Sequence, residues 1–169
     1  LFSISNKLVW NKVSEATLEF AYQGPLLELV GESALIAISG KVNFNIINKK
    51  GETKKGTPNE SSLIFNGDRI DILSTINSVY GYLSIFGGFE LNKTKESFST
   101  LVRAKIGPNN GDKLKTDDKI FYKESKPPEK IKKIKFEFDN DNTIRVMEGL
   151  QFNYFSKKSK KDFFLKQYK

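Results

Sequence analysis

Short β-rich runs that end at glycine or another turn residue constrain this chain more than any other feature of its sequence. In most runs Val, Ile, Leu or Phe alternates with small or polar residues, as in a strand with one buried face. The expected strands are 16–22, 26–30, 34–39, 42–47, 63–65, 69–73, 79–86 and 101–106. The turn sequences Gly24–Pro25 and Asn66–Gly67–Asp68 each predict a hairpin between the runs on either side. Many short strands joined by such turns predict a mostly β fold, a barrel or a sandwich.

Helices are expected at both ends of the chain. Apolar residues in 1–9 and 152–168 recur at helical spacing, and residues 49–60 form a polar loop rich in lysine.

A lysine-rich segment that contains Pro127–Pro128 predicts a boundary. We expect a first domain at 1–122, a linker at 123–130, and the beginning of a second domain at 131–169 with strands at 131–138 and 143–147.

The residue types that are missing narrow the possible chemistry. The chain has no Cys and no His, which excludes disulfides, thiolate nucleophiles, cysteine zinc sites and a histidine base. It also has no run long enough to cross a membrane and no signal-peptide pattern, so we expect a cytoplasmic protein without a membrane partner. Because the chain begins with Leu1 and not Met, we expect it to be a piece of a longer protein.

The formal net charge of +8 suggests nucleic-acid binding, but its distribution does not. Most of the excess lies in 123–135 and in 145–169, away from the strand-rich part. No aromatic side chains interleave with the first cluster, and no nucleic-acid-binding signature is nearby. A solvated basic surface is the favoured interpretation, and we expect no nucleic-acid partner.

The stretch Gly81–Thr100 is the best candidate for a ligand site. Its apolar run stops at Gly87–Gly88, where the backbone can adopt a positive φ, and the loop that follows carries the hydroxyls of Ser97, Ser99 and Thr100. Such a loop can present hydrogen-bonding groups to a small ligand. An ordinary strand followed by a solvated hairpin loop is the simpler alternative.

Two other motifs carry no chemistry. Gly107–Lys113 lacks the glycine spacing of a phosphate-binding P-loop and has Asp112 directly after Gly111. Asp117–Asp118 is a lone acidic pair in a lysine-rich turn, so no metal site is expected.

Several blocks nevertheless resemble, in order and spacing, a carboxyltransferase-type family. That family includes allophanate hydrolase subunit 2, the carboxyltransferase-type subunit of bacterial 5-oxoprolinase, the antagonist of the sporulation-kinase inhibitor, and the carboxyltransferase domain of urea amidolyase. The block from Asn6 to Asn11 is similar to its A-N-x-L-V-G-N helix end, with Trp10 in place of Gly, and Gly81–Gly88 is similar to its Y-L-A-V-x-G-G strand. The other similar blocks are Ala16–Glu19, Gly24–Pro25, Ala37–Gly40, Gly67–Asp68, Ser97–Thr100, Gly111–Asp118, Ile144–Val146 and Gly149–Gln151.

The resemblance implies a cyclophilin-like β-barrel with short helices, followed by the start of a second similar domain. The family chain is about twice as long, as two domains require. By this resemblance we expect that the family's N-terminal segment with T-V-Q-D-x-G-R, and most of the second domain, are missing from this piece. The resemblance then implies that residues 1–169 carry one wall of a site that lies between two domains.

The function that the resemblance implies is a subunit of an ATP-dependent amide hydrolase. The first candidate is the carboxyltransferase-type subunit of 5-oxoprolinase, which acts with a subunit-B-like and an amidohydrolase-like partner; ATP belongs to the complex. The substrate-binding residues that follow from this are Asn6, Ser39, Gly40, Gly87, Gly88, Ser97, Ser99, Thr100 and Gln151, and no catalytic residue is assigned.

Two alternatives remain open. One is biotin-dependent carboxyl transfer in a urea carboxylase and allophanate hydrolase system, with biotin carried by another chain. The other is a non-enzymatic regulatory binding protein, which is consistent with departures from the family pattern at Glu96, Asp112, Asp117 and Leu150.

Overall fold

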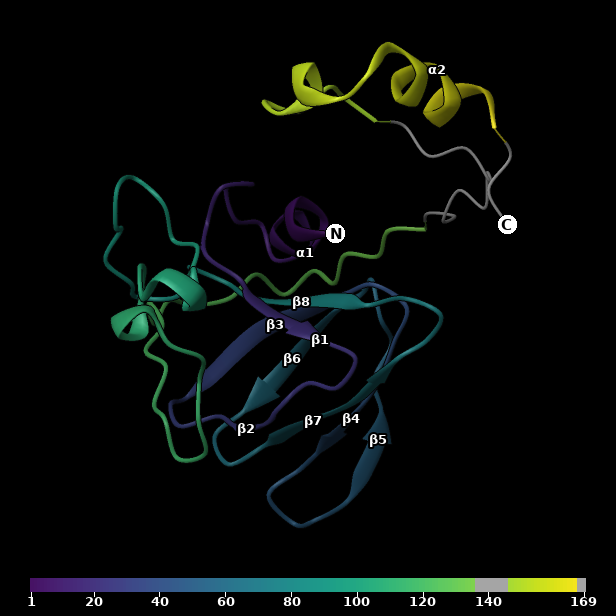
Figure 1. Cartoon of the computed structure of the whole chain (residues 1–169). Coiled ribbons are helices and arrows are strands. Elements are labelled where there is room, and N and C mark those ends of the chain that lie inside the picture. Colours follow the sequence, from purple (N-terminus) through teal and green to yellow (C-terminus); the bar gives the residue numbers. More distant parts are fainter. Residues whose placement is uncertain (136–145, 167–169) are drawn as a thin grey trace. The chain divides into compact units, whose positions relative to one another are not determined.

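We describe a computed structural model that covers residues 1–135 and 146–166 (Figure 1). The chain divides into two compact units, unit 1 (Leu1–Lys135) and unit 2 (Phe136–Lys169). The predicted linker, 123–130, lies within unit 1.

Unit 1 contains two four-stranded antiparallel sheets. Sheet A has the order β1-β8-β3-β6, formed by Leu18–Ala21, Tyr80–Ile85, Ser33–Ser39 and Ser61–Phe65. Sheet B has the order β2-β7-β4-β5, formed by Leu26–Glu28, Arg69–Thr75, Val42–Ile47 and Thr53–Lys55. The prediction of a mostly β fold is confirmed.

Both predicted hairpins are wrong, because their turns connect the two sheets. β1 pairs with β8 whereas β2 pairs with β7, and β6 pairs with β3 whereas β7 pairs with β4 and β2. The physical reason is the core: crossing at Asn66–Asp68 lets Ile64 of sheet A and Ile72 of sheet B, each 1% exposed, pack into one cluster. The turn residues therefore predict where the chain reverses, and burial decides which strand becomes the partner.

Two shorter predictions also change. The expected loop 49–60 contains β5, whose residues are all exposed. The expected strand 101–106 is a 3₁₀ helix, η1 (Val102–Ala104), closed by a bridge between Leu101 and Ile106.

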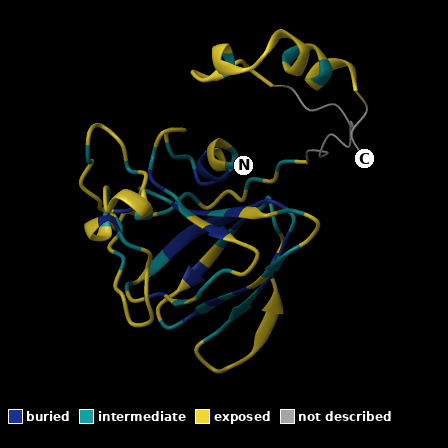
Figure 2. Ribbon diagram, in the orientation of Figure 1, coloured by how far each residue is buried: buried dark blue, intermediate teal, exposed yellow. Residues whose placement is uncertain are grey.

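The hydrophobic core has two parts. The larger part fills the space between the sheets and includes Phe20, Phe44 and Leu83. The smaller part lies beneath α1 (Phe2–Leu8), where Leu8 and Val9 pack against Leu35 and Ala37 of β3. α1 therefore covers the face of sheet A that is turned away from sheet B (Figure 1), and Figure 2 shows the buried residues concentrated in the strands and beneath this helix.

The end of unit 1 forms a strap, Lys132–Ile134, along the start of β6. The N–H of Lys132 donates to Ser61 Oγ at 2.8 Å, and the N–H of Ser61 donates to the Lys132 carbonyl at 2.8 Å. The N–H of Ile134 donates to the Asn59 carbonyl at 3.0 Å, and Lys132 Nζ lies 4.0 Å from the centroid of the Trp10 ring. The strap thus ties α1 to sheet A.

Unit 2 contains η3 (Phe152–Tyr154) and α2 (Lys157–Leu165). The single helix predicted at 152–168 is interrupted at Ser156, whose side chain caps α2 by accepting from Ser159 N–H at 3.1 Å. Of the predicted strands 131–138 and 143–147, residues 136–138 and 143–145 fall outside the described residues. In the described parts, 131–135 forms one bridge, at Lys133, and 146–147 are not in a strand.

None of the helices in the described ranges is both long enough and apolar enough to span a membrane.

Candidate functional site

The register of sheet A separates the predicted site residues into two groups. Ser39 of β3 lies opposite Tyr82 of β8, and Ile36 lies opposite Ile85. These pairs are three residues apart, about 10 Å at the rise of a strand. Because β3 and β8 are antiparallel, Gly40 follows β3 at one end of the sheet and Gly87 follows β8 at the other end. We call the two ends of the sheet the Gly40 end and the Gly87 end; a small ligand cannot contact both backbones at once.

At the Gly87 end, the side chain of Asn11 holds the turn that follows β8. Its Oδ1 accepts from the N–H of Gly87 at 3.0 Å, and its Nδ2 donates to the carbonyl of Ile85 at 2.8 Å. The side chain thus bonds the backbone on both sides of Phe86, as a neighbouring strand would.

Asn6 links this contact to the rest of α1. It is fully buried, its Nδ2 donates to the carbonyl of Glu15 at 2.8 Å, and its Oδ1 accepts from Asn11 Nδ2 and from Ser84 Oγ, both at 3.2 Å. Ser84 Oγ also lies 2.9 Å from Ser5 Oγ. Both polar atoms of the Asn6 side chain therefore bond to protein groups, and the predicted substrate contact of Asn6 stays a prediction.

The Gly87–Gly88 turn is crowded and has positive φ at both glycines. A Cβ on Gly87 would lie 2.6 Å from the carbonyl oxygen of Lys123, and one on Gly88 would lie 3.1 Å from a carboxylate oxygen of Glu15. The N–H of Gly88 donates to the Ile85 carbonyl at 3.0 Å. Both amide N–H groups of the turn are therefore already donated to protein acceptors.

At the Gly40 end, Asn59 plays the equivalent part. Its Oδ1 accepts from Gly40 N–H at 3.0 Å, its Nδ2 donates to the Gly40 carbonyl at 3.3 Å, and its backbone has a φ of 62°. Ser39 Oγ is fully buried and donates to the Leu1 carbonyl at 2.9 Å. Sequence reasoning did not single out Asn59 or Asn11; the position of Asn11 in the NKLVWN block was the available signal.

The loop between β8 and the strap carries the predicted hydroxyls. Thr94 and Ser97 exchange backbone hydrogen bonds, and Ser97 Oγ accepts from Ser99 N–H at 3.1 Å. Thr100 Oγ1 donates to the Pro108 carbonyl at 3.4 Å. Phe98 packs against the core between the two sheets, so the loop is anchored between two exposed serines. Ser97, Ser99 and Thr100 are thus all exposed, and the hydroxyl of Thr100 already donates to a protein acceptor.

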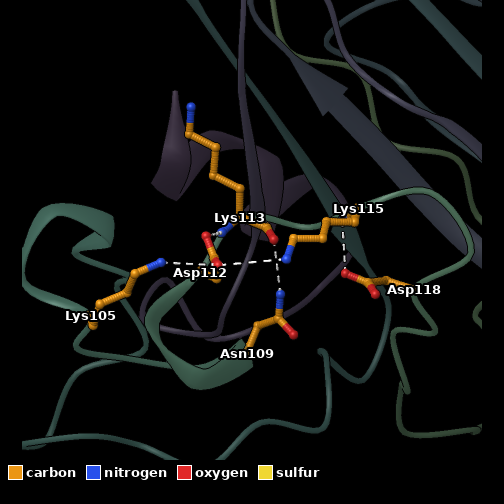
Figure 3. A network of polar contacts seen from close by, with 6 residues as sticks. All are labelled: Lys105, Asn109, Asp112, Lys113, Lys115 and Asp118. Atoms are coloured by element: carbon orange, nitrogen blue, oxygen red, sulfur yellow. Dashed lines mark hydrogen bonds and ion pairs between the residues drawn. The ribbon is translucent and has the colours of Figure 1, made fainter.

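The same loop contains a polar network centred on Asp112 (Figure 3). Asp112 Oδ2 lies 3.0 Å from Lys105 Nζ and 3.7 Å from Lys115 Nζ, while Oδ1 accepts from Lys113 N–H at 2.9 Å. The hydrogen bond from Lys105, followed by that from Lys113 N–H, lowers the pKa of the Asp112 carboxyl from its ordinary value. Asp112 therefore closes the loop by pairing with Lys105 and Lys115.

Asp118 also has a structural part. Its Oδ2 accepts from Lys115 N–H at 2.8 Å, within a turn closed by the Asp118 N–H and the Lys115 carbonyl. Within the described ranges, no cluster of three carboxylates suited to a metal ion is found.

The outer face of sheet A carries a perturbed tyrosine. Tyr82 Oη donates to Glu19 Oε2 at 2.6 Å across the β1–β8 pair, and the ring of Phe2 packs edge-on at 6.3 Å between centroids. Burial, together with the bond to Glu19, raises the pKa of Tyr82 to about 12. The phenol is therefore a hydrogen-bond donor throughout the physiological range.

Gln151, the remaining predicted residue, belongs to unit 2. It precedes η3 and lines a hollow together with Gly149, Leu150, Phe152 and Phe155. This hollow is built from residues of unit 2 alone, and its ligand-binding role stays a prediction.

Comparisons with known proteins agree with this architecture. The family described as "Carboxyltransferase domain, subdomain A and B" matches residues 1–169. Urea amidolyase from Lachancea kluyveri is 28% identical over 120 residues, which is 71% of this chain and 6% of that protein.

Two solved structures resemble the fold at similar identity. The crystal structure of TTHA0988 matches with a TM-score of 0.67 and 26% identity, covering 80% of this chain and 48% of that one. The urea carboxylase of Kluyveromyces lactis matches with a TM-score of 0.66 and 26% identity, covering 75% of this chain and 11% of that one. The chain thus spans less than half the length of each of these relatives.

Proposed function

The chain belongs to the family of carboxyltransferase domains with subdomains A and B, and on this premise we propose that it is part of an ATP-dependent amide hydrolase. Its first candidate role is that of the carboxyltransferase-type subunit of 5-oxoprolinase, in a complex with a subunit-B-like and an amidohydrolase-like partner. The observation that carries the proposal is the family match over residues 1–169, combined with the ordered sequence blocks that end α1, β3 and β8.

The chemistry of a lactam explains why such a complex needs ATP. The amide carbon of 5-oxoproline is a poor electrophile at neutral pH, and phosphorylation of the lactam oxygen makes it reactive. Donors aimed at the developing charge then lower the barrier to attack by water. In this proposal the full complex binds ATP, and this chain contributes part of the wall that binds the lactam.

The hydrogen bonds of unit 1 indicate which donors are available to that substrate. The N–H groups of Gly40, Gly87 and Gly88 and the hydroxyl of Ser39 all donate to protein acceptors. Ser97 Oγ accepts one hydrogen bond and keeps its own proton to donate, and Ser99 is exposed beside it. We therefore assign the contact with the lactam oxygen to Ser97 and Ser99, and the shaping of the site to the Gly87–Gly88 turn.

A reconstitution experiment tests the proposal. The full-length protein is mixed with its two partner subunits, ATP and 5-oxoproline, and glutamate and ADP are measured with each chain omitted in turn. We expect glutamate only in the complete mixture. We expect Ser97→Ala combined with Ser99→Ala to lower kcat/KM about 10-fold or more, whereas Ser74→Ala in β7 of sheet B leaves it unchanged. Glutamate release without this chain would overturn the proposal.

Biotin-dependent carboxyl transfer to urea is the second candidate. It is favoured by the relatives whose names contain urea, namely the urea amidolyase and the urea carboxylase. In the same reconstitution, ATP consumption that requires urea and a biotinylated carrier, without glutamate release, would support this candidate. A silent mixture that still binds a protein partner would instead support the regulatory alternative.

A further inference from the structure

The Gly87–Gly88 turn depends on a side chain that the sequence did not single out. In the segment from Ile85 to Gly88, the N–H of Gly88 donates to the Ile85 carbonyl, the N–H of Phe86 donates to the Leu35 carbonyl of β3, and the Gly88 carbonyl accepts from Lys123 N–H. These bonds leave the N–H of Gly87 without a backbone acceptor. Asn11 supplies two further bonds, accepting from Gly87 N–H and donating to the Ile85 carbonyl, although it lies 76 residues from Gly87 in the sequence.

Asn11 is itself held in place by α1. Its backbone N–H donates to the Asn6 carbonyl at 2.9 Å, and its Nδ2 lies 3.2 Å from Asn6 Oδ1. Asn6 in turn is fixed by Ser84 and by the Glu15 carbonyl. A chain of amide hydrogen bonds therefore runs from the loop around Glu15 through Asn6 and Asn11 to Gly87, and bonds in such a chain reinforce one another.

We propose that Asn11 is a positioning residue of the candidate site: it fixes the Gly87–Gly88 turn, and through that turn the start of the loop that carries Ser97 and Ser99. This inference rests on the proposed function for its catalytic consequence. Asn11 makes no contact with substrate in this account; it acts through Gly87. The shape of the asparagine amide, with an acceptor and a donor on one carbon, is what the two backbone groups require.

The test compares Asn11→Ala and Asn11→Asp with Asn48→Ala and Asn48→Asp in the full-length complex. Asn48 also holds a turn with its side chain, because its Oδ1 accepts from the N–H groups of Lys50 and Glu52. That turn joins β4 to β5 in sheet B. The two positions are thus matched in residue type and in turn-holding role, and they differ in the turn that they hold.

We expect Asn11→Ala to lower kcat for glutamate release about 10- to 100-fold, the cost of a reacting group displaced by about 1 Å, with a change in KM below about threefold. The Asn48 variants keep wild-type kcat. In Asn11→Asp the ionised carboxylate has no proton to donate to the Ile85 carbonyl. The protonated acid has one and restores this hydrogen bond. The ratio of the kcat of this variant to that of wild type therefore rises as the pH falls toward the pKa of the new carboxyl.

Amide hydrogen exchange gives a second readout that does not depend on the reaction. We expect faster exchange in residues 84–89 of the Asn11 variants and unchanged exchange there in the Asn48 variants. Unchanged exchange in 84–89 would overturn the inference whatever the enzyme does. Wild-type kcat in folded Asn11→Ala would overturn its catalytic consequence. If the wild-type complex releases no glutamate, the proposed function fails, while the exchange result still decides whether Asn11 holds the turn.

Discussion

The two ends of sheet A are built in the same way but differ in how well they should tolerate substitution. At each end a glycine with positive φ follows a strand, and an asparagine distant in sequence binds the glycine backbone: Asn59 at Gly40 and Asn11 at Gly87. A Cβ on Gly40 would meet its nearest atom at 3.3 Å, whereas one on Gly87 would meet the Lys123 carbonyl oxygen at 2.6 Å. The Gly87 end is also where the loop with Ser97 and Ser99 begins. The comparison indicates that the sheet is built more tightly at the end where the candidate site lies.

Replacement of the two glycines by alanine should give the largest difference in stability between the two ends of sheet A. We expect Gly87→Ala to destabilise the fold by about 3 kcal/mol, because its φ of 84° is strained for alanine and the nearest atom is backbone that cannot turn aside. Gly40→Ala is also strained, at a φ of 122°, but its Cβ would meet the nearest atom only at 3.3 Å, so it should cost about 1 to 2 kcal/mol. Urea unfolding of the two variants measures both values. Equal costs would remove the difference in tolerance between the two ends.

Replacement of the two asparagines should separate their backbone roles. We expect Asn11→Ala and Asn59→Ala each to cost about 2 kcal/mol, because the first removes the acceptor of Gly87 N–H and the second removes the side-chain partner of Gly40 N–H. Asn59 has a φ of 62°, so Asn59→Gly should be less damaging than Asn59→Ala. Asn11 does not have a positive φ, so Asn11→Gly should be no better than Asn11→Ala. The four unfolding free energies test this, and a gain from glycine at position 11 would contradict it.

The strap contacts both ends of sheet A, and replacing its Lys132 should lower stability less than replacing either asparagine. Lys132 lies over Trp10, next to Asn11, and Ile134 donates to the carbonyl of Asn59. Lys132→Met keeps most of the apolar stem and removes the ammonium, which should cost about 0.5 to 1 kcal/mol. Thermal unfolding measures the loss, with Lys130→Met as the control. A loss as large as that from Asn11→Ala would mean that the strap, and not the asparagine, dominates this end.

The smallest expected effect is a titration at the outer face of sheet A. Burial and then Glu19 raise the pKa of Tyr82 to about 12 from an ordinary value of 10.0. The folded state therefore binds this proton more tightly than the unfolded state. The resulting stability is fully present below pH 10 and is lost as the pH rises toward about 12.

The difference in tyrosinate absorbance between wild type and Tyr82→Phe locates this pKa. Glu19→Gln should lower it only in part, since burial is the larger cause. A pKa near 10 in the wild type would contradict the packing of Phe2 and Glu19 against this ring.

The sequence predicted the elements of the first unit better than their partners. Residues 34–39, 42–47 and 79–86 were predicted as strands because apolar residues alternate or cluster between turn residues, and β3, β4 and β8 lie there. The two hairpin predictions were wrong because Gly24–Pro25 and Asn66–Asp68 specify that the chain reverses, but not which strand the next strand pairs with. The three residues of β5 are all exposed, and so they left no apolar pattern to detect.

The kinds of residue in the candidate site could be predicted from the sequence, but their positions relative to one another could not. Gly40 and Gly87 both end apolar runs, and nothing local to either run shows that antiparallel pairing sends them to opposite ends of a sheet. Asn11 and Asn59 act on residues far along the chain, and an isolated asparagine in a sequence has many other uses. Long-range register is therefore the information that the sequence alone did not supply.

The most direct test of this account is amide hydrogen exchange of the full-length complex, measured by mass spectrometry with and without 5-oxoproline in the presence of a non-hydrolysable ATP analogue. We predict slower exchange on substrate binding in residues 84–100, which span the Gly87 turn and the Ser97–Thr100 loop, and no change in residues 38–42 at the Gly40 end. Protection of residues 38–42 alone, or of neither segment, would contradict the assignment of the site to the Gly87 end.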